Sequence, residues 1–232
     1  MIRVFLVTAA LVTLLGPPVV NAADGPLALK KGDRIVFLGD SITAGGVGAQ
    51  GYITVIKNTL NEKQKDLAIE LVGAGISGNK VPDLQKRVER DVVAKKPTIV
   101  FIYIGINDVW HGEKDPTRGT PKDKFEAGLK EVIGKITTAG GQVVLCTPTV
   151  IGEKKDGANK LDAQLDEYAE ISRKVAKELK LPVCDLRKAF VEHLKTSNAE
   201  NKESGILTTD RVHLNPAGNK LVAETMLKAL GQ

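Results

Sequence analysis

The chain has 232 residues, a hydrophobic share of 42% and a formal net charge of +5. This length and composition suit one globular α/β domain with a full core. Lysines are interspersed with acidic residues, which favours a solvated mixed-charge surface over a nucleic-acid-binding stripe, so we expect no nucleic-acid partner.

The first 22 residues have the pattern of a secretory signal peptide. Arg3 precedes the apolar run 4–15, which is too short to span a bilayer as a folded anchor, and small residues follow at 20–23. The alternative is a buried N-terminal strand or helix. The pattern predicts a signal peptide over 1–22, a single mature domain over 23–232, a secreted or periplasmic location and no stable membrane anchor.

Short apolar runs alternate with longer amphipathic runs along the rest of the chain. We expect strands at 34–38, 68–73, 98–104, 142–146 and 183–186. We expect helices at 52–65, 81–95, 122–139, 161–179, 188–194 and 217–230. Strand and helix alternating in this way predict an α/β fold with a five-stranded parallel sheet wrapped on both faces.

Polar or glycine-rich clusters follow the first three expected strands. Asp40-Ser41 follows the first strand, 75–78 follows the second and 105–108 follows the third. Ligands of parallel sheets bind beyond the carboxyl ends of the strands, so these clusters should converge on one site.

Ser41, His213 and Asp210 suit a hydrolase that activates a serine. His213 is one of three histidines, and Asp210 stands three residues before it. His213 would take the proton of Ser41 and return it to the leaving alcohol, while Asp210 would orient the imidazole. The oxyanion of the intermediate needs hydrogen-bond donors, for which the N–H groups of Ser41 and Gly78 and the amide of Asn107 are the natural set. Alternatively, 39–41 is only a strand-end turn and His213 only a helix cap.

Four sequence blocks resemble those of the SGNH hydrolases, also called GDSL esterases. They occur in the family's order and span nearly the whole mature chain: Gly39-Asp40-Ser41-Ile42-Thr43, Ile76-Ser77-Gly78-Asn79, Gly105-Ile106-Asn107-Asp108 and Asp210-Arg211-Val212-His213. The resemblance implies a three-layer α/β/α flavodoxin-like fold and ester hydrolysis without metal or other cofactor. It also implies Ser41 as nucleophile, His213 as base, Asp210 as the third triad member, and Gly78 and Asn107 as oxyanion donors. Arg211 departs from the small residue of many relatives.

Two other features compete with this interpretation. His193 and His111 are rival bases, but His193 should lie at a helix surface, and His111 is better placed as a substrate contact. Residues 46–51 fit the dinucleotide motif G-x-G-x-x-G, yet seven residues separate its first glycine from the preceding strand. We therefore expect no nucleotide cofactor.

The polar loop 109–121 should form one wall of the cleft. Its Trp110 and His111, with Asp40, are the predicted substrate-binding residues, since an aromatic ring beside charged groups suits a sugar. A plain surface loop is the alternative. With no broad apolar lid segment, the sequence predicts hydrolysis of small acyl esters, with acetyl esters on a carbohydrate as the leading candidate. The alternatives are a lipase, lysophospholipase or thioesterase acting on longer chains, and a non-catalytic glycan-binding protein.

Cys146 and Cys184 both lie in expected strands. Two buried thiols are favoured over a disulfide, because strand-centre pairs seldom meet disulfide geometry.

Overall fold

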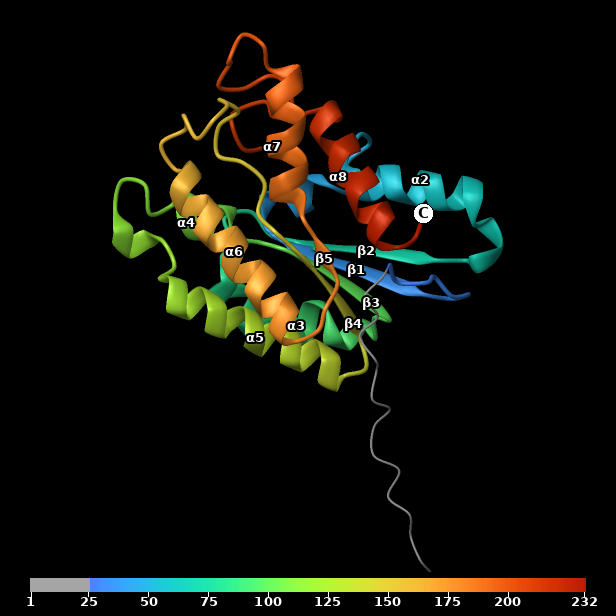
Figure 1. The fold of residues 1–232 in the computed structure, drawn as a ribbon. Coiled ribbons are helices and arrows are strands. Elements are labelled where there is room, and N and C mark those ends of the chain that lie inside the picture. Colours follow the sequence, from blue (N-terminus) through green and yellow to red (C-terminus); the bar gives the residue numbers. More distant parts are fainter. Residues whose placement is uncertain (1–25) are drawn as a thin grey trace, which may run out of the picture.

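The computed structural model describes residues 26–232 (Figure 1). The predicted signal peptide and the expected start of the mature chain lie outside the described residues.

One five-stranded parallel sheet organises the molecule. Its strands lie in the order β2-β1-β3-β4-β5. They are β1 (Arg34–Gly39), β2 (Glu70–Gly75), β3 (Ile99–Tyr103), β4 (Gln142–Cys146) and β5 (Val183–Cys184). This order is that of the flavodoxin-like folds and confirms the predicted fold class. The central strand β3 is buried along its whole length, which explains why its sequence is a continuous apolar run.

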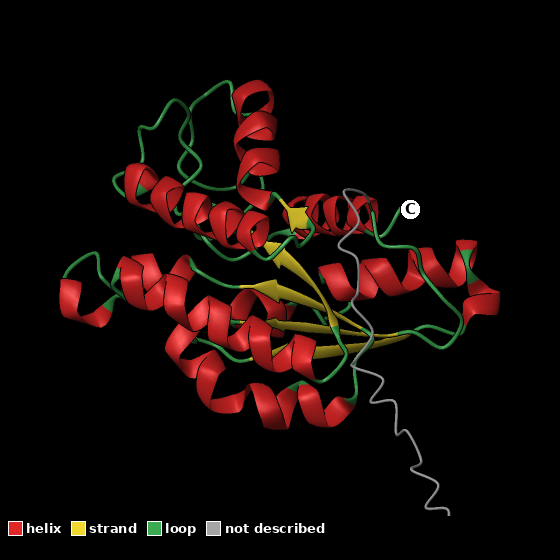
Figure 2. Cartoon of the chain, turned by 60° about the horizontal axis from the view of Figure 1, so that its bottom comes forward, coloured by secondary structure: helices red, strands yellow, loops and turns green. Residues whose placement is uncertain are grey.

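Helices cover both faces of the sheet (Figures 1 and 2). On one face α2 packs on α8, which also contacts α7, and on the other α5 lies between α3 and α6. The two short helices α1 and α4 follow β1 and β3 directly. The helices are α1 (Ser41–Gly45), α2 (Tyr52–Lys63), α3 (Val81–Asp91), α4 (Ile106–Trp110), α5 (Lys122–Thr138), α6 (Asp162–Glu178), α7 (Leu186–Ser197) and α8 (Pro216–Ala229).

Every expected element except the strand 142–146 differs from the structure at one end or both, and three of the differences have a clear local cause. Strand β2 begins two residues later than expected, because a 3-10 turn at Lys65–Leu67 ends on Ala68 with φ +49°. The helix expected over 81–95 ends at Asp91 and gives way to a 3-10 turn at Val93–Lys95. Strand β5 has only two residues, because Asp185 already caps α7 by accepting a hydrogen bond from the N–H of Lys188.

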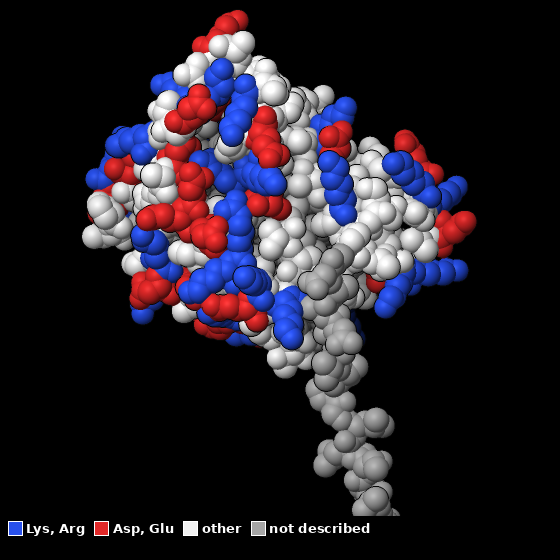
Figure 3. Space-filling view, viewed as in Figure 1, with Lys and Arg blue, Asp and Glu red and all other residues white. Residues whose placement is uncertain are grey.

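The surface mixes both signs of charge, as Figure 3 shows for one face. Within residues 26–232, no helix has the length and apolar character needed to cross a membrane. Cys146 and Cys184 occupy paired positions on β4 and β5 and are both buried free thiols.

The strand order reverses between β1 and β3. The chain runs from β1 to β2 on one side of β1 and then crosses over to β3, which pairs with β1 on its other side. In doubly wound sheets the ligand crevice lies at this point, beyond the carboxyl ends of the two strands. Strand β1 leads there into Asp40-Ser41, and β3 leads into Gly105 and α4.

Candidate active site

The end of β1 places Ser41 at the first position of α1. A Cβ atom at Gly39 would lie 2.2 Å from Thr43 Oγ1 and 2.5 Å from the carbonyl oxygen of Tyr103, so only glycine fits at this strand end. Asp40 caps the helix, since its Oδ1 accepts a 2.9 Å hydrogen bond from the N–H of Ile42. The N–H of Ser41 therefore lies in a first helical turn, where donors lack an intrahelical acceptor.

Ser41, His213 and Asp210 form a continuous chain of polar contacts. Ser41 Oγ lies 2.9 Å from His213 Nε2, and His213 Nδ1 lies 2.6 Å from Asp210 Oδ2. The other oxygen of Asp210 accepts from the N–H groups of Val212 and His213. Partial burial of the Asp210 carboxyl acts against its charge, but these hydrogen bonds outweigh burial and hold its pKa below the ordinary value.

A tight loop between α7 and α8 carries Asp210 and His213. Thr208 pairs with Leu214 in an antiparallel bridge, and the N–H of Thr209 donates to the carbonyl oxygen of His213 over 2.8 Å. Arg211 lies between them with φ +85°, a conformation that is unfavourable for a residue with a side chain. The departure from a small residue noted in the sequence thus falls on a backbone position that favours glycine.

Gly78 and Asn107 belong to two neighbouring segments of the site. Gly78 is exposed in a turn after β2, with φ +78°. Asn107 is buried in α4, and its Nδ2 donates a 3.1 Å hydrogen bond to the carbonyl oxygen of Asn79. An amide NH₂ has two hydrogens, so this contact fixes the Asn107 side chain and leaves one donor free.

Two buried carboxyl groups are chain neighbours of the predicted site residues: Asp40 precedes Ser41, and Asp108 follows Asn107. Asp40 is only 2% exposed, and burial raises its pKa from 3.8 to about 7. Asp108 accepts from the N–H of Val81 at 3.0 Å, and burial raises its pKa to about 6. The contacts of Asp40 are those of a helix cap, so its predicted substrate contact stays a prediction.

Trp110 and His111 are the other predicted substrate contacts, and the Trp110 ring lies near both His111 and His213. The Trp110 ring centroid is 6.4 Å from that of His213, with the rings nearly perpendicular, and 6.5 Å from that of His111. Partial burial, followed by the charges of Lys80 and Arg118, lowers the pKa of His111. The third histidine, His193, lies on α7 and is partly exposed.

Arg87 of α3, which was not predicted from the sequence, is a buried arginine that joins three parts of the site. Its guanidinium donates to the carbonyl oxygen of Gly39 (2.7 Å), to that of Ala74 (2.9 Å) and to Asn79 Oδ1 (2.7 Å). It thereby links the ends of β1 and β2 to the turn that follows Gly78. The available signal was its place on the apolar stripe of α3, three residues after Leu84.

Comparisons with known proteins show the family of this chain. The profile of the GDSL-like Lipase/Acylhydrolase family matches residues 37–221. An acetylxylan esterase of Geobacillus stearothermophilus is 33% identical over 220 residues, which are 88% of this chain and 97% of that protein. A rat isoamyl acetate-hydrolyzing esterase 1 homolog is 23% identical over 82% of this chain and 78% of its own length.

Solved structures are similar along nearly their whole length. The crystal structure of an acetyl xylan esterase, AlAXEase, has a TM-score of 0.82 and 46% identity over 85% of this chain and 99% of its own. Other structures of the Geobacillus enzyme are described as catalytic mutants in which a serine, an aspartate or a histidine is replaced by alanine. The chain therefore belongs to the GDSL-like lipase/acylhydrolase family, as its SGNH blocks predicted, and is a carboxylic ester hydrolase.

Proposed function

We propose that this chain is an acetyl esterase that removes acetyl groups from a carbohydrate such as xylan or its oligosaccharides. The observation that carries the proposal is the pair of contacts that joins Ser41 Oγ to His213 Nε2 and His213 Nδ1 to Asp210 Oδ2, at 2.9 and 2.6 Å. The acetylxylan esterases among the relatives support the substrate class, and the mutants of one of them support a Ser-His-Asp triad.

The hydrogen bonds suit His213 as a general base. With its Nδ1–H donated to Asp210, the neutral ring presents the Nε2 lone pair to the Ser41 hydroxyl. Ser41 Oγ then attacks the acetyl carbonyl carbon as its proton passes to Nε2. The imidazolium that forms lies against the Asp210 carboxylate, which stabilises its charge.

The oxyanion of the tetrahedral intermediate would accept hydrogen bonds from the N–H groups of Ser41 and Gly78 and from Asn107 Nδ2. On collapse, His213 returns the proton to the departing sugar oxygen and leaves Ser41 acetylated. A water molecule then attacks the acetyl carbonyl, again with His213 as base. The bond between the acetyl carbon and Ser41 Oγ then breaks as His213 Nε2 returns its proton to Oγ, which releases acetate and restores the enzyme.

Two partly exposed side chains near the proposed triad support a carbohydrate as the leaving group. Trp110 presents an aromatic ring beside His213, and such rings pack against the apolar faces of sugars. His111 adds a polar group next to Gly78, since a Cβ atom built there would lie 4.0 Å from His111 Cε1. We assign Trp110 and His111 to substrate binding.

We also propose that the enzyme is exported, with residues 1–22 as its signal peptide and 23–232 as its esterase domain. The basic residue, apolar run and small residues at the N-terminus support this. N-terminal sequencing of exported protein should begin near residue 23. A chain that retains Met1 outside the cell would contradict the cleavage.

The test of the function compares acetate release from acetylated xylo-oligosaccharides with hydrolysis of p-nitrophenyl acetate, butyrate and octanoate. Wild type should prefer the acetyl substrates, and Ser41→Ala should lose turnover while it keeps its fold. A preference for octanoate would support the lipase or thioesterase alternative instead. Turnover that survives in Ser41→Ala would place the nucleophile elsewhere.

A further inference from the structure

Glu153 is a fully buried carboxylate that receives four hydrogen bonds. It follows β4 and is 0% exposed. Its Oε2 accepts from the N–H of Ile206 (2.8 Å), and its Oε1 accepts from the N–H of Leu207 (2.7 Å) and from both the N–H (2.5 Å) and the Oγ1 (2.8 Å) of Thr208. Three successive backbone N–H groups thus converge on one side chain.

These donors are all neutral. Among the residues that the structure describes, no Lys or Arg side chain forms an ion pair with Glu153. A concave set of successive backbone N–H groups is a known way to hold an anion. A buried carboxylate that lacked these donors would be strongly unfavourable, so the segment 206–208 and the Glu153 side chain fix each other.

The same segment leads directly into the loop that carries Asp210 and His213. Thr208, the last residue bound by Glu153, pairs with Leu214 in the bridge that closes this loop. Gly152, which precedes Glu153, holds the loop on the other side of Asp210. Its N–H donates a 2.8 Å hydrogen bond to the carbonyl oxygen of Arg211. Residues 152 and 153 therefore hold the loop both before and after Asp210.

The backbone of Glu153 is anchored in turn to the end of α7. Its carbonyl oxygen accepts from Asn198 Nδ2 at 2.8 Å, and its N–H donates to the carbonyl oxygen of Glu203 at 3.0 Å. Asn198 is itself buried. Glu153 is therefore held from both sides and can serve as a fixed point for a loop that has no helix or strand of its own.

We propose that Glu153 is a positioning residue that sets the place of Asp210 and His213 relative to Ser41. The inference rests on the proposed triad, and Glu153 acts through the loop, with no contact to the reacting atoms. Its carboxylate matches the donors as no neutral side chain can. A glutamine in its place would put an NH₂ group where Oε2 now accepts a hydrogen bond from the N–H of Ile206, so that two donors would face each other.

The first test is Glu153→Gln, with Glu200→Gln as the matched control, since Glu200 is an exposed glutamate that forms a surface ion pair with Lys202. We expect kcat to fall about 100-fold with KM nearly unchanged, because a shift of about 1 Å in a reacting group has an effect of this size. We also expect the low-field NMR signal of the His213 Nδ1 proton to move or broaden. Glu200→Gln should match wild type in both.

A milder pair covers the case in which Glu153→Gln does not fold. Thr208→Val removes only the hydroxyl donor to Glu153 and should lower kcat about 3- to 10-fold, the effect of one hydrogen bond. Thr208→Ser restores the donor and should recover the rate.

A folded Glu153→Gln or Thr208→Val variant with wild-type kcat and an unchanged Nδ1 signal would overturn the proposal, even if its melting temperature fell. Failure of the triad itself would be seen separately, as turnover that survives in Ser41→Ala.

Discussion

Ser41 Oγ lies 2.9 Å from His213 Nε2, although 172 residues separate the two in the chain. Ser41 follows the first strand, and His213 immediately precedes the last helix. They meet because β1 ends at the point where the strand order reverses, and the loop before α8 reaches the carboxyl end of this strand. The central contact of the site is thus a product of topology.

The two site histidines should differ sharply in kinetic effect. His213→Ala removes the proposed base and should lower kcat by about 10²- to 10⁴-fold, the range of general-base catalysis. His111→Ala should mainly raise KM for acetylated xylo-oligosaccharides, because His111 lies at the rim beside Gly78. Steady-state kinetics of both variants, with His193→Ala on α7 as control, measure this. The reverse ranking would reassign the base.

Asn107 should stabilise the transition state. Asn107→Ala removes the proposed oxyanion donor and should lower kcat about 10²- to 10³-fold, equivalent to roughly 3 kcal/mol, with little change in KM. Asn107→Asp keeps the size of the side chain but cannot donate, so it should be impaired to a similar degree. Melting temperatures show whether the lost bond to Asn79 also loosens the fold. A well-folded Asn107→Asp enzyme with normal kcat would exclude the amide as a donor.

The fold was largely predictable because each buried strand is a continuous apolar run bounded by polar residues. The expected strand 142–146 matches β4 residue for residue. The short helices α1 and α4 were missed, since five residues are too few to show a helical period. The start of β2 depends on the left-handed backbone at Ala68, and the end of α3 depends on the bend at Val92. The side chains at these positions carry little signal for either conformation.

The proposed catalytic residues could be named from the sequence for a different reason. Ser41, Asn107 and His213 stand in blocks that resemble those of the SGNH hydrolases, and the structure brings Ser41 and His213 into contact, while their catalytic roles stay predictions. Arg87 and Glu153 stand in no such block, and their importance arises from backbone groups that only the folded chain brings to them. A charged residue on an apolar stripe was the one available hint, and it applied to Arg87 alone.

Asp40 should make stability depend on pH. Its pKa is raised by burial to about 7 in the folded chain, whereas the unfolded chain releases the proton near 3.8. Between these values the folded state binds more protons, so stability falls as pH rises through this window. Asp40→Asn keeps an oxygen to cap α1 and removes the buried charge.

Urea unfolding of both proteins from pH 4 to pH 8 measures the effect. Relative to Asp40→Asn, wild type should lose at most about 1.4 kcal/mol of unfolding free energy per pH unit up to pH 7 and little beyond it. A difference between the two proteins that is the same at every pH would show that Asp40 does not titrate in this range.

Arg87 should couple the ends of β1 and β2. Arg87→Lys cannot donate to Gly39, Ala74 and Asn79 at once, because an ammonium lacks the planar fork of a guanidinium. We expect a loss of about 2 to 4 kcal/mol in unfolding free energy, since buried carbonyl oxygens are left without donors. Lys86→Ala, at an exposed neighbouring position, is the control. A lysine variant as stable as wild type would contradict this role.

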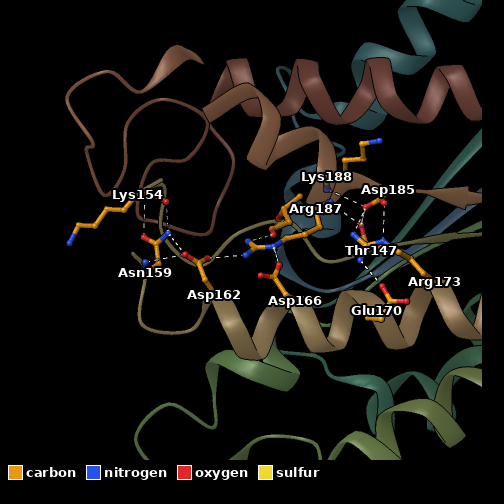
Figure 4. A network of polar contacts seen from close by, with 11 residues as sticks. Thr147, Lys154, Asn159, Asp162, Asp166, Glu170, Arg173, Asp185, Arg187 and Lys188 are labelled. Atoms are coloured by element: carbon orange, nitrogen blue, oxygen red, sulfur yellow. Dashed lines mark hydrogen bonds and ion pairs between the residues drawn. The ribbon is translucent and has the colours of Figure 1, made fainter. Parts of the chain in front are cut away.

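Arg187 of α7 should be the main electrostatic link between α7 and α6. Figure 4 shows its guanidinium directed at Asp162 and Asp166, with contacts of 2.9 and 2.7 Å, and its side chain is 5% exposed. Asp162 is also buried, so Arg187→Met should leave a carboxylate without its partner and reduce stability by about 3 to 5 kcal/mol. Asp166 is exposed, and Asp166→Ala should change stability by no more than about 1 kcal/mol.

The double variant Arg187→Met with Asp162→Leu separates the ion pair from its burial. Removing both charges leaves no buried unpaired charge, although the donors of Asn159 and the carbonyl oxygen of Thr149 lose a partner. The double variant should therefore regain part of the stability that the single variant loses. Urea denaturation of the single and double variants gives the coupling energy. If the double variant were less stable than Arg187→Met by the full effect of Asp162→Leu alone, the two side chains would act independently. The ion pair between Arg187 and Asp162 would then have no measurable coupling energy of its own.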